Sequence, residues 1–178
     1  MSIQYCLRKI AIIVFITFLI LCQSVYAQEE NQPKGKTYLT AGFGVMEVFN
    51  IGLDLENNNS QFGFKVGGLV ADGETLFSLT GDYSYYFAGN SKRTNNRTWF
   101  GKTGLQYFSD KADTFHEKAA YLFARVGKRF YFSSKAGVKI DLGMGFRIHH
   151  YEYYKQRPLI DFDFPVMPGM GISFFYRI

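Results

Sequence analysis

The chain has 178 residues, which suits a single domain, and 20 Lys and Arg against 15 Asp and Glu give a formal net charge of +5. That balance is too mild to indicate a nucleic-acid partner. Aromatic residues make up 19% of the sequence and glycine occurs 18 times, with only four prolines and two cysteines. Such a composition is unusual for a soluble domain.

The N-terminal segment 1–27 is predicted to be a secretory signal peptide. Two basic residues precede an apolar run from Ile10 to Leu21, which is too short to span a bilayer comfortably. A small-residue cleavage pattern ends at Ala27, and we expect cleavage there. The alternative is a retained membrane anchor.

Both cysteines, Cys6 and Cys22, lie in the predicted signal peptide. The exported chain is therefore expected to have no disulfide, no thiol nucleophile and no cysteine metal site. Residues 28–36 are polar and contain Pro33 and Gly35, which favours a flexible periplasmic lead-in before the domain at 37–178.

From residue 37 onward, apolar residues recur at every second position, and no segment shows a sustained helical period. This alternation is typical of strands with one apolar and one polar face. It predicts eight strands, over 37–45, 49–56, 61–71, 75–87, 98–108, 120–132, 137–149 and 166–178. Polar segments at 109–119 and 152–165 are expected to be external loops.

The last predicted strand is the most informative. Every second residue is apolar, namely Val166, Pro168, Met170, Ile172, Phe174, Tyr176 and Ile178. A soluble protein rarely ends on a long strand whose outer face is wholly apolar, whereas an outer-membrane β-barrel does so because that face meets lipid.

Glycines gather on the opposite, inner face of the predicted strands. The inner set is Gly42, Gly44, Gly52, Gly63, Gly67, Gly104, Gly127, Gly137, Gly143, Gly145, Gly169 and Gly171. An eight-stranded barrel is barely wide enough inside for side chains, so small residues suit its interior. A soluble sandwich would place bulky apolar residues there instead.

These patterns predict an all-β, eight-stranded, antiparallel up-and-down transmembrane β-barrel. Ten strands and a soluble barrel of lipocalin type, with the apolar face inside, are the alternatives. Rings at the membrane interface are expected near the periplasmic rim at Tyr85, Phe87, Trp99, Phe132 and Tyr176, and near the outer rim at Tyr107. Lys128 falls on the apolar face, through a bulge or by snorkelling.

The signal peptide, the eight alternating strands and the terminal Ile172-Ser173-Phe174-Phe175-Tyr176-Arg177-Ile178 resemble small outer-membrane β-barrels of the OmpA/OmpX and porin-family kind. The resemblance implies an outer-membrane location, with outer-membrane lipid and lipopolysaccharide as partners. It also implies recognition by the barrel-insertion machinery through Ile172–Ile178.

Charged residues on the predicted inner face are expected to form a polar network, because a buried ion is costly unless it is paired. The set is Asp54, Lys65, Asp82, Lys102, Arg125, Arg129, Asp141 and Arg147. Heights along the strands predict the pairs Asp82–Lys102, Asp54–Lys65, and Asp141 with Arg125 and Arg129. The network either fills the lumen or lines a passage that selects a solute.

One cluster resembles a catalytic site: His149, His150 and Glu152, where the seventh predicted strand meets an outer loop. No serine lies next to His149, Ser173 is expected to lie far below it, and His116 is assigned to a different loop. We therefore predict no catalytic, cofactor or metal site. The predicted role is structural or surface-interacting, with a narrow pore or small-ligand barrel and a lipid-modifying enzyme as alternatives.

Overall fold

The structure is a computed structural model that describes residues 35–45, 47–71, 74–112, 115–154 and 165–178. The predicted signal peptide and residues 28–34 of the lead-in lie outside the described residues, and the barrel belongs to the compact unit Gly35–Ile178. Within the described ranges, no helix is long and apolar enough to cross a membrane.

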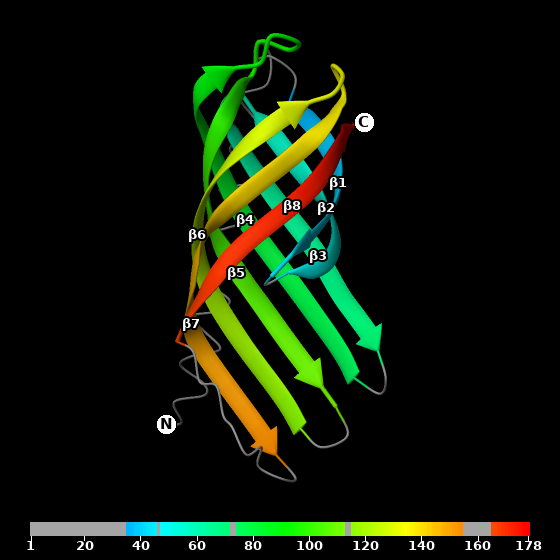
Figure 1. The fold of residues 1–178 in the computed structure, drawn as a ribbon, viewed down its shortest axis with the longest axis vertical. Helices are drawn as coiled ribbons and strands as arrows, with labels where there is room; N and C mark the ends of the chain where they lie inside the picture. Colours follow the sequence, from blue (N-terminus) through cyan, green and yellow to red (C-terminus); the bar gives the residue numbers. More distant parts are fainter. Residues whose placement is uncertain (1–34, 46, 72–73, 113–114, 155–164) are drawn as a thin grey trace, which may run out of the picture. The chain divides into compact units, whose positions relative to one another are not determined.

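Eight antiparallel strands form one closed barrel, in the order in which they occur along the chain (Figure 1). The strands are β1 (Lys36–Gly44), β2 (Val48–Asn57), β3 (Ser60–Ala71), β4 (Glu74–Asn90), β5 (Arg97–Lys111), β6 (Phe115–Tyr131), β7 (Ala136–Tyr154) and β8 (Val166–Arg177). The predicted eight-stranded up-and-down barrel is confirmed, and in the part of the chain that the structure describes the ten-strand alternative is wrong.

The apolar face of the barrel lies outside. Ile140, Leu142, Ile172 and Phe174 expose 44, 65, 43 and 59% of their surface, whereas Asp141, between two of them, exposes 3%. The lipocalin-type alternative, which would gather these apolar side chains inside, is therefore wrong.

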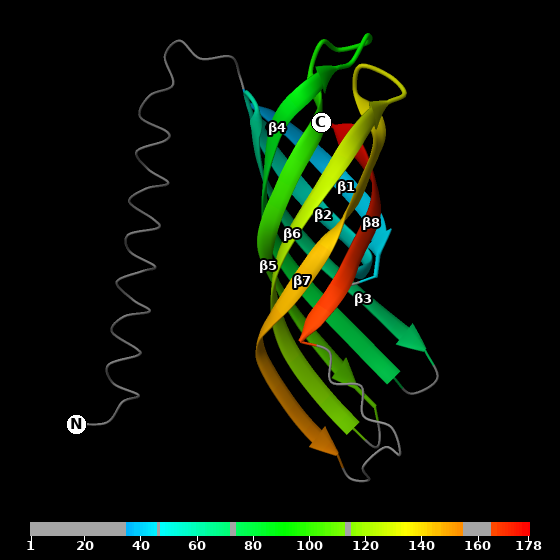
Figure 2. The same cartoon turned by 60° about the vertical axis from the view of Figure 1, so that its left-hand side comes forward.

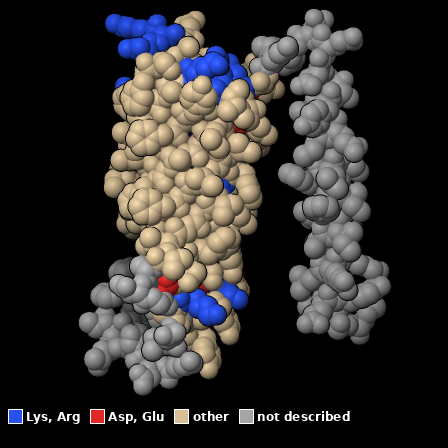
Figure 3. Space-filling model, turned by 90° about the vertical axis from the view of Figure 1, so that its right-hand side faces the viewer, with Lys and Arg blue, Asp and Glu red and all other residues tan. Residues whose placement is uncertain are grey.

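The outer surface is divided into zones along the barrel. On the face seen in Figure 3, Lys and Arg gather at the two ends, and the band between them is almost free of charged side chains. Trp99, exposed by 42%, lies toward the end at which β1 starts and β8 finishes, which we call the terminal end. Lys128 faces outward without a bulge, its Nζ 5.1 Å from the Trp99 ring centroid and 5.3 Å from that of Phe130.

At the opposite end, which we call the distal end, the strands from β3 to β7 project beyond β1, β2 and β8 (Figure 1). The predicted loop at 109–119 is wrong, because most of it is paired strand in β5 and β6, with Asp110 opposite Glu117. Polar residues occupy both faces there, so backbone pairing continues where apolar alternation has ended. Residues 155–164 of the second predicted loop lie outside the described residues.

A register shift between Ala120 and Tyr121 alters the alternation along β7. Ala120 pairs with His149, but Tyr121 pairs with Arg147, so β7 carries one extra residue there. Beyond this bulge His149 is exposed and His150 is half-buried on the inner side. Strict alternation from Arg147 on the inner face predicts that His149 also faces inward, and the bulge shows that this is wrong.

The barrel closes where β1 meets β8 (Figure 2), along the ladder from Tyr38–Arg177 to Gly44–Gly171. This ladder is much shorter than that of β6 and β7, which runs from Phe115–Tyr154 to Tyr131–Gly137.

Candidate functional site: the charged interior of the barrel

Five carboxylates and five cations among the described residues meet inside the barrel, and each of these side chains is at most 9% exposed. The carboxylates are Glu47, Asp54, Glu56, Asp82 and Asp141, and the cations are Lys65, Lys102, Arg125, Arg129 and Lys139. Their charges balance, as ions held away from water require.

Arg129 is the centre of the layer nearest the terminal end. Its Nη1 donates to Glu56 Oε2 at 2.5 Å and to the Tyr131 hydroxyl at 2.8 Å, and its Nη2 donates to the Tyr86 hydroxyl. Tyr38 donates to the other Glu56 oxygen at 3.3 Å. The guanidinium is also surrounded by rings, with its carbon 4.0 Å from the Tyr86 centroid and 5.2 Å from that of Phe175.

The next layer joins β7 to β2, β3 and β4. Lys139 Nζ donates to Asp54 Oδ2 at 2.5 Å and to Gln61 Oε1 at 2.7 Å. Lys65 forms an ion pair with Asp82 and lies 3.9 Å from Asp54 Oδ1. The two lysines therefore share Asp54 between them.

The layer nearest the distal end is built around Asp141. Its two carboxylate oxygens lie 2.5 Å from Lys102 Nζ and 3.1 Å from Arg125 Nη1. Arg125 Nη1 also lies 2.7 Å from Glu47 Oε1. Since Lys102 and Arg125 are directly opposite on β5 and β6, Asp141 separates two like charges that would otherwise face each other.

Some of the ion pairs predicted from heights along the strands form in the structure, and others do not. Asp54 does meet Lys65, but Asp82 pairs with Lys65 rather than Lys102, because Lys102 lies opposite Ser84 and reaches Asp141 across β6. Arg129 does not reach Asp141, and its carboxylate partner is Glu56, in the same layer as Arg129.

Three members of the network were not among the residues singled out from the sequence. Glu56 and Lys139 share the inner face with predicted members, so the alternation could have found both. Glu47 lies between β1 and β2, where no alternation exists to mark it. Arg147 lies farther along β7, where its backbone amide donates to the Pro165 carbonyl at 2.9 Å.

Glycines make room for the charged side chains. A Cβ atom at Gly63 would lie 2.7 Å from an oxygen of Asp54 and 2.8 Å from one of Asp82. A Cβ at Gly169 would lie 2.8 Å from Arg125 Nε. A larger residue at either position would displace an ion pair, which explains why these glycines face inward.

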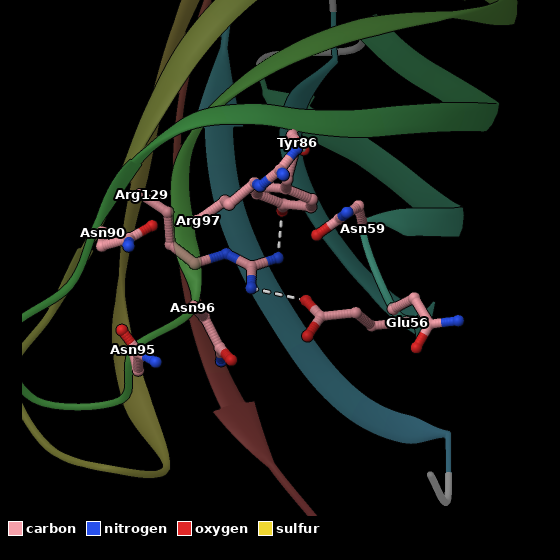
Figure 4. A pocket seen from close by; sticks show the side chains of 9 residues that line it. Glu56, Asn59, Tyr86, Asn90, Asn95, Asn96, Arg97 and Arg129 are labelled. Atoms are coloured by element: carbon pink, nitrogen blue, oxygen red, sulfur yellow. Dashed lines mark hydrogen bonds and ion pairs between the residues drawn. The ribbon is translucent and has the colours of Figure 1, made fainter. Parts of the chain in front are cut away.

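A polar cavity of about 260 Å³ opens beside Arg129 at the terminal end (Figure 4). Its lining consists of Glu56, Asn58, Asn59, Tyr86, Asn90, Asn95, Asn96, Arg97 and Arg129. A second cavity, beside Glu47, Arg125 and Asp141, measures about 10 Å³, the size of one water molecule. Arg129 and Glu56 thus line the first cavity, and Lys65, Lys102, Arg125 and Asp141 line the second.

The β7 bulge separates the residues of the cluster that resembled a catalytic site, because it turns His149 and His150 to opposite faces of the strand. His150 Nε2 lies 2.6 Å from Glu152 Oε1 and 3.3 Å from Glu117 Oε1, whereas His149 points away from them. Ser173 lies opposite Lys139, far down β7 from His150. His116 belongs to β6 rather than to a loop, and its Nε2 lies 3.4 Å from Ser109 Oγ.

No protein-family model matches the chain, and no curated protein sequence is significantly similar to it. The barrel is similar to the N-terminal β-barrel domain of OprF from Pseudomonas aeruginosa, with a TM-score of 0.53 and 14% sequence identity. The match covers 80% of this chain and 100% of that one. At this identity the similarity shows the fold alone, and it confirms the OmpA-like barrel fold predicted from the sequence.

Proposed function

We propose that the protein is an integral outer-membrane barrel with a closed lumen, which acts as a structural or surface-interaction protein rather than as an enzyme. The observation that carries this proposal is the inverted distribution of polarity: apolar side chains cover the outside while ion pairs fill the inside. A closed sheet leaves no unpaired backbone edge, so it can reside in lipid.

The ion-pair layers support a closed lumen rather than a pore. To open a passage, the layers around Asp54, Arg129 and Asp141 would each have to separate. Removing the partner of a buried charge costs about 3–5 kcal/mol, so thermal opening of all three layers is rare. The cavity beside Arg129 supports small-ligand binding at the terminal end as the second candidate.

The projecting ends of β5, β6 and β7 support a surface role. Both ends of the barrel chain, at Lys36 and Arg177, lie at the terminal end. With that end in the periplasm, the projecting strands and the predicted loop 152–165 would face the outside of the cell, where they can contact partners.

Two measurements test the proposal. The protein should partition into detergent and should migrate differently on a gel with and without heating, because a lipid-exposed barrel resists unfolding by detergent alone. In planar bilayers it should produce no steady current steps. Partition into the aqueous phase would contradict the membrane barrel, and steady steps would contradict only the closed lumen.

The contact between Ser109 and His116 favours lipid acyl hydrolysis as a further candidate, since a serine nucleophile needs a base within hydrogen-bond reach. Lipid A mass spectra of cells with and without the protein distinguish it. Unchanged spectra remove this candidate, and changed spectra that revert with Ser109→Ala would replace the non-enzymatic proposal.

A further inference from the structure

We propose that Glu117, His150 and Glu152 form a binding site for a divalent transition-metal ion of the zinc class. One imidazole nitrogen and one oxygen from each carboxylate all lie within 4.8 Å of one another. Donor atoms that share a tetrahedral zinc ion lie ~3.3 Å apart, as its bond lengths of about 2.0–2.2 Å require. His150 Nε2 lies 3.3 Å from Glu117 Oε1, which matches that separation, and 2.6 Å from Glu152 Oε1, which would lengthen when a metal ion binds.

The strand register concentrates negative charge at this point. Glu117 lies directly opposite Glu152 on β7, and directly opposite Asp110 on its other neighbour, β5. Like charges in directly opposed positions destabilise a sheet. The three carboxylates therefore repel one another across adjacent strands, and a bound cation would remove that repulsion.

Burial also acts on two of these carboxyl groups. Burial, together with the neighbouring Glu152 carboxylate, raises the pKa of Glu117 above its ordinary value, although His150 opposes the rise. Burial and the charge of Glu74 raise the pKa of Asp110. One oxygen of Asp110, which lies directly opposite Glu117, is buried without a hydrogen-bond partner.

The donor types indicate which metal would bind. Calcium and magnesium prefer all-oxygen sites, whereas an imidazole with carboxylates suits zinc and similar ions. Three protein ligands leave a fourth position for water. All three ligands stand on paired strands, so the site is held by the sheet.

The bulge at Ala120 and Tyr121 creates the site, because it turns His150 inward and His149 outward. The adjacent histidines therefore provide a matched pair for testing. Only His150 can reach Glu117 and Glu152, while His149 has the same chemistry on the opposite face of the strand.

The test is a calorimetric titration of the purified, metal-stripped protein in detergent with zinc chloride. We expect one zinc ion per chain, at least a tenfold loss of affinity in His150→Ala and in Glu117→Gln, and unchanged affinity in His149→Ala. Gel shift on heating verifies that each variant is folded, and zinc should raise the thermal midpoint of the wild type but not of His150→Ala.

Three results would overturn the proposal. They are the absence of saturable zinc binding by the wild type, an equal loss of affinity in His149→Ala and His150→Ala, and calcium binding as tight as zinc binding that survives His150→Ala. The last would show a group of acidic side chains attracting any cation. None of these results depends on whether the lumen conducts, so the proposed function is tested separately.

Discussion

Arg129 on β6 and Glu56 on β2 are 73 residues apart in the chain, and their side chains meet across the barrel axis with a separation of 2.5 Å. Because β2 and β6 are not neighbours in the sheet, this pair links two walls that no backbone hydrogen bond connects. It therefore measures how far contacts in the interior, rather than in the sheet, stabilise the barrel.

Removing one member of this pair should destabilise the barrel strongly. We expect Glu56→Gln to lower the free energy of unfolding by about 3–5 kcal/mol, since it leaves the Arg129 charge buried without a carboxylate. The double variant with Arg129→Met should lose clearly less than the sum of the single losses. Urea unfolding in lipid vesicles measures all three, and additive losses would show that the pair does not interact.

Asp82 should be coupled energetically to Lys65 and not to Lys102. A double-mutant cycle with Asp82→Asn and Lys65→Met should give a coupling of about 1–3 kcal/mol, because the two side chains form an ion pair. The same cycle with Lys102→Met should give less than about 0.5 kcal/mol. A larger coupling energy with Lys102 than with Lys65 would support the Asp82–Lys102 pair that the sequence predicted.

Two glycines on opposite faces of the sheet should respond differently to alanine. Gly63→Ala should cost about 1–3 kcal/mol, because its Cβ would crowd Asp54 and Asp82. Gly81→Ala is the control, since no atom lies within 4 Å of its Cβ position, and its effect should remain within about 0.5 kcal/mol. Equal effects would mean that the interior tolerates added volume.

A charged substitution on the outer face tests whether the apolar band contacts lipid. Leu142→Arg should cost about 2–4 kcal/mol in vesicles, as a charged residue near the bilayer midplane does. Ile148→Arg, near the end of the apolar band, should cost about 0–1 kcal/mol. If Leu142→Arg is as mild as Ile148→Arg, the band does not lie in lipid.

Glu117 should make the metal-free protein less stable as the pH rises. A carboxyl group whose pKa is raised by folding binds its proton more tightly in the folded state, so its contribution is most favourable below 4.5 and declines as the pH rises from there to the folded pKa. Asp110, His150 and Glu152 face the same space as Glu117. With a chelator present, Glu117→Gln should flatten the decline of the thermal midpoint with pH.

The matched control for this prediction is Lys118→Gln, on the outer face beside Glu117. In this variant the thermal midpoint should decline with pH as steeply as in the wild type. If Glu117→Gln leaves the pH dependence of the thermal midpoint unchanged, a group other than Glu117 causes it.

The sequence predicted the strands and their faces because alternation is a local property: Ile140 and Asp141 differ in character, and the pleat turns them to opposite sides. It did not predict the ion-pair partners, because strand tilt and stagger decide which side chains share a height. Lys102 thus reaches Asp141 rather than Asp82.

The distal end was hardest to predict, for two physical reasons. Above the apolar band both faces of the strands are polar, so 109–119 carried no alternation although its backbone is paired. A single extra residue near His149 then reversed the phase of β7 and brought His150 to Glu117, a contact between strands that spacing along one strand cannot reveal.

The short ladder between β1 and β8 sets how this protein must assemble. Its two partners are β1 and β8, so the ring cannot be completed until β8 has been synthesised. A chain truncated within β8 would keep seven strands, with an open edge on each side and charged groups exposed to hydrocarbon. Closure of the whole barrel therefore depends on β8 (Val166–Arg177).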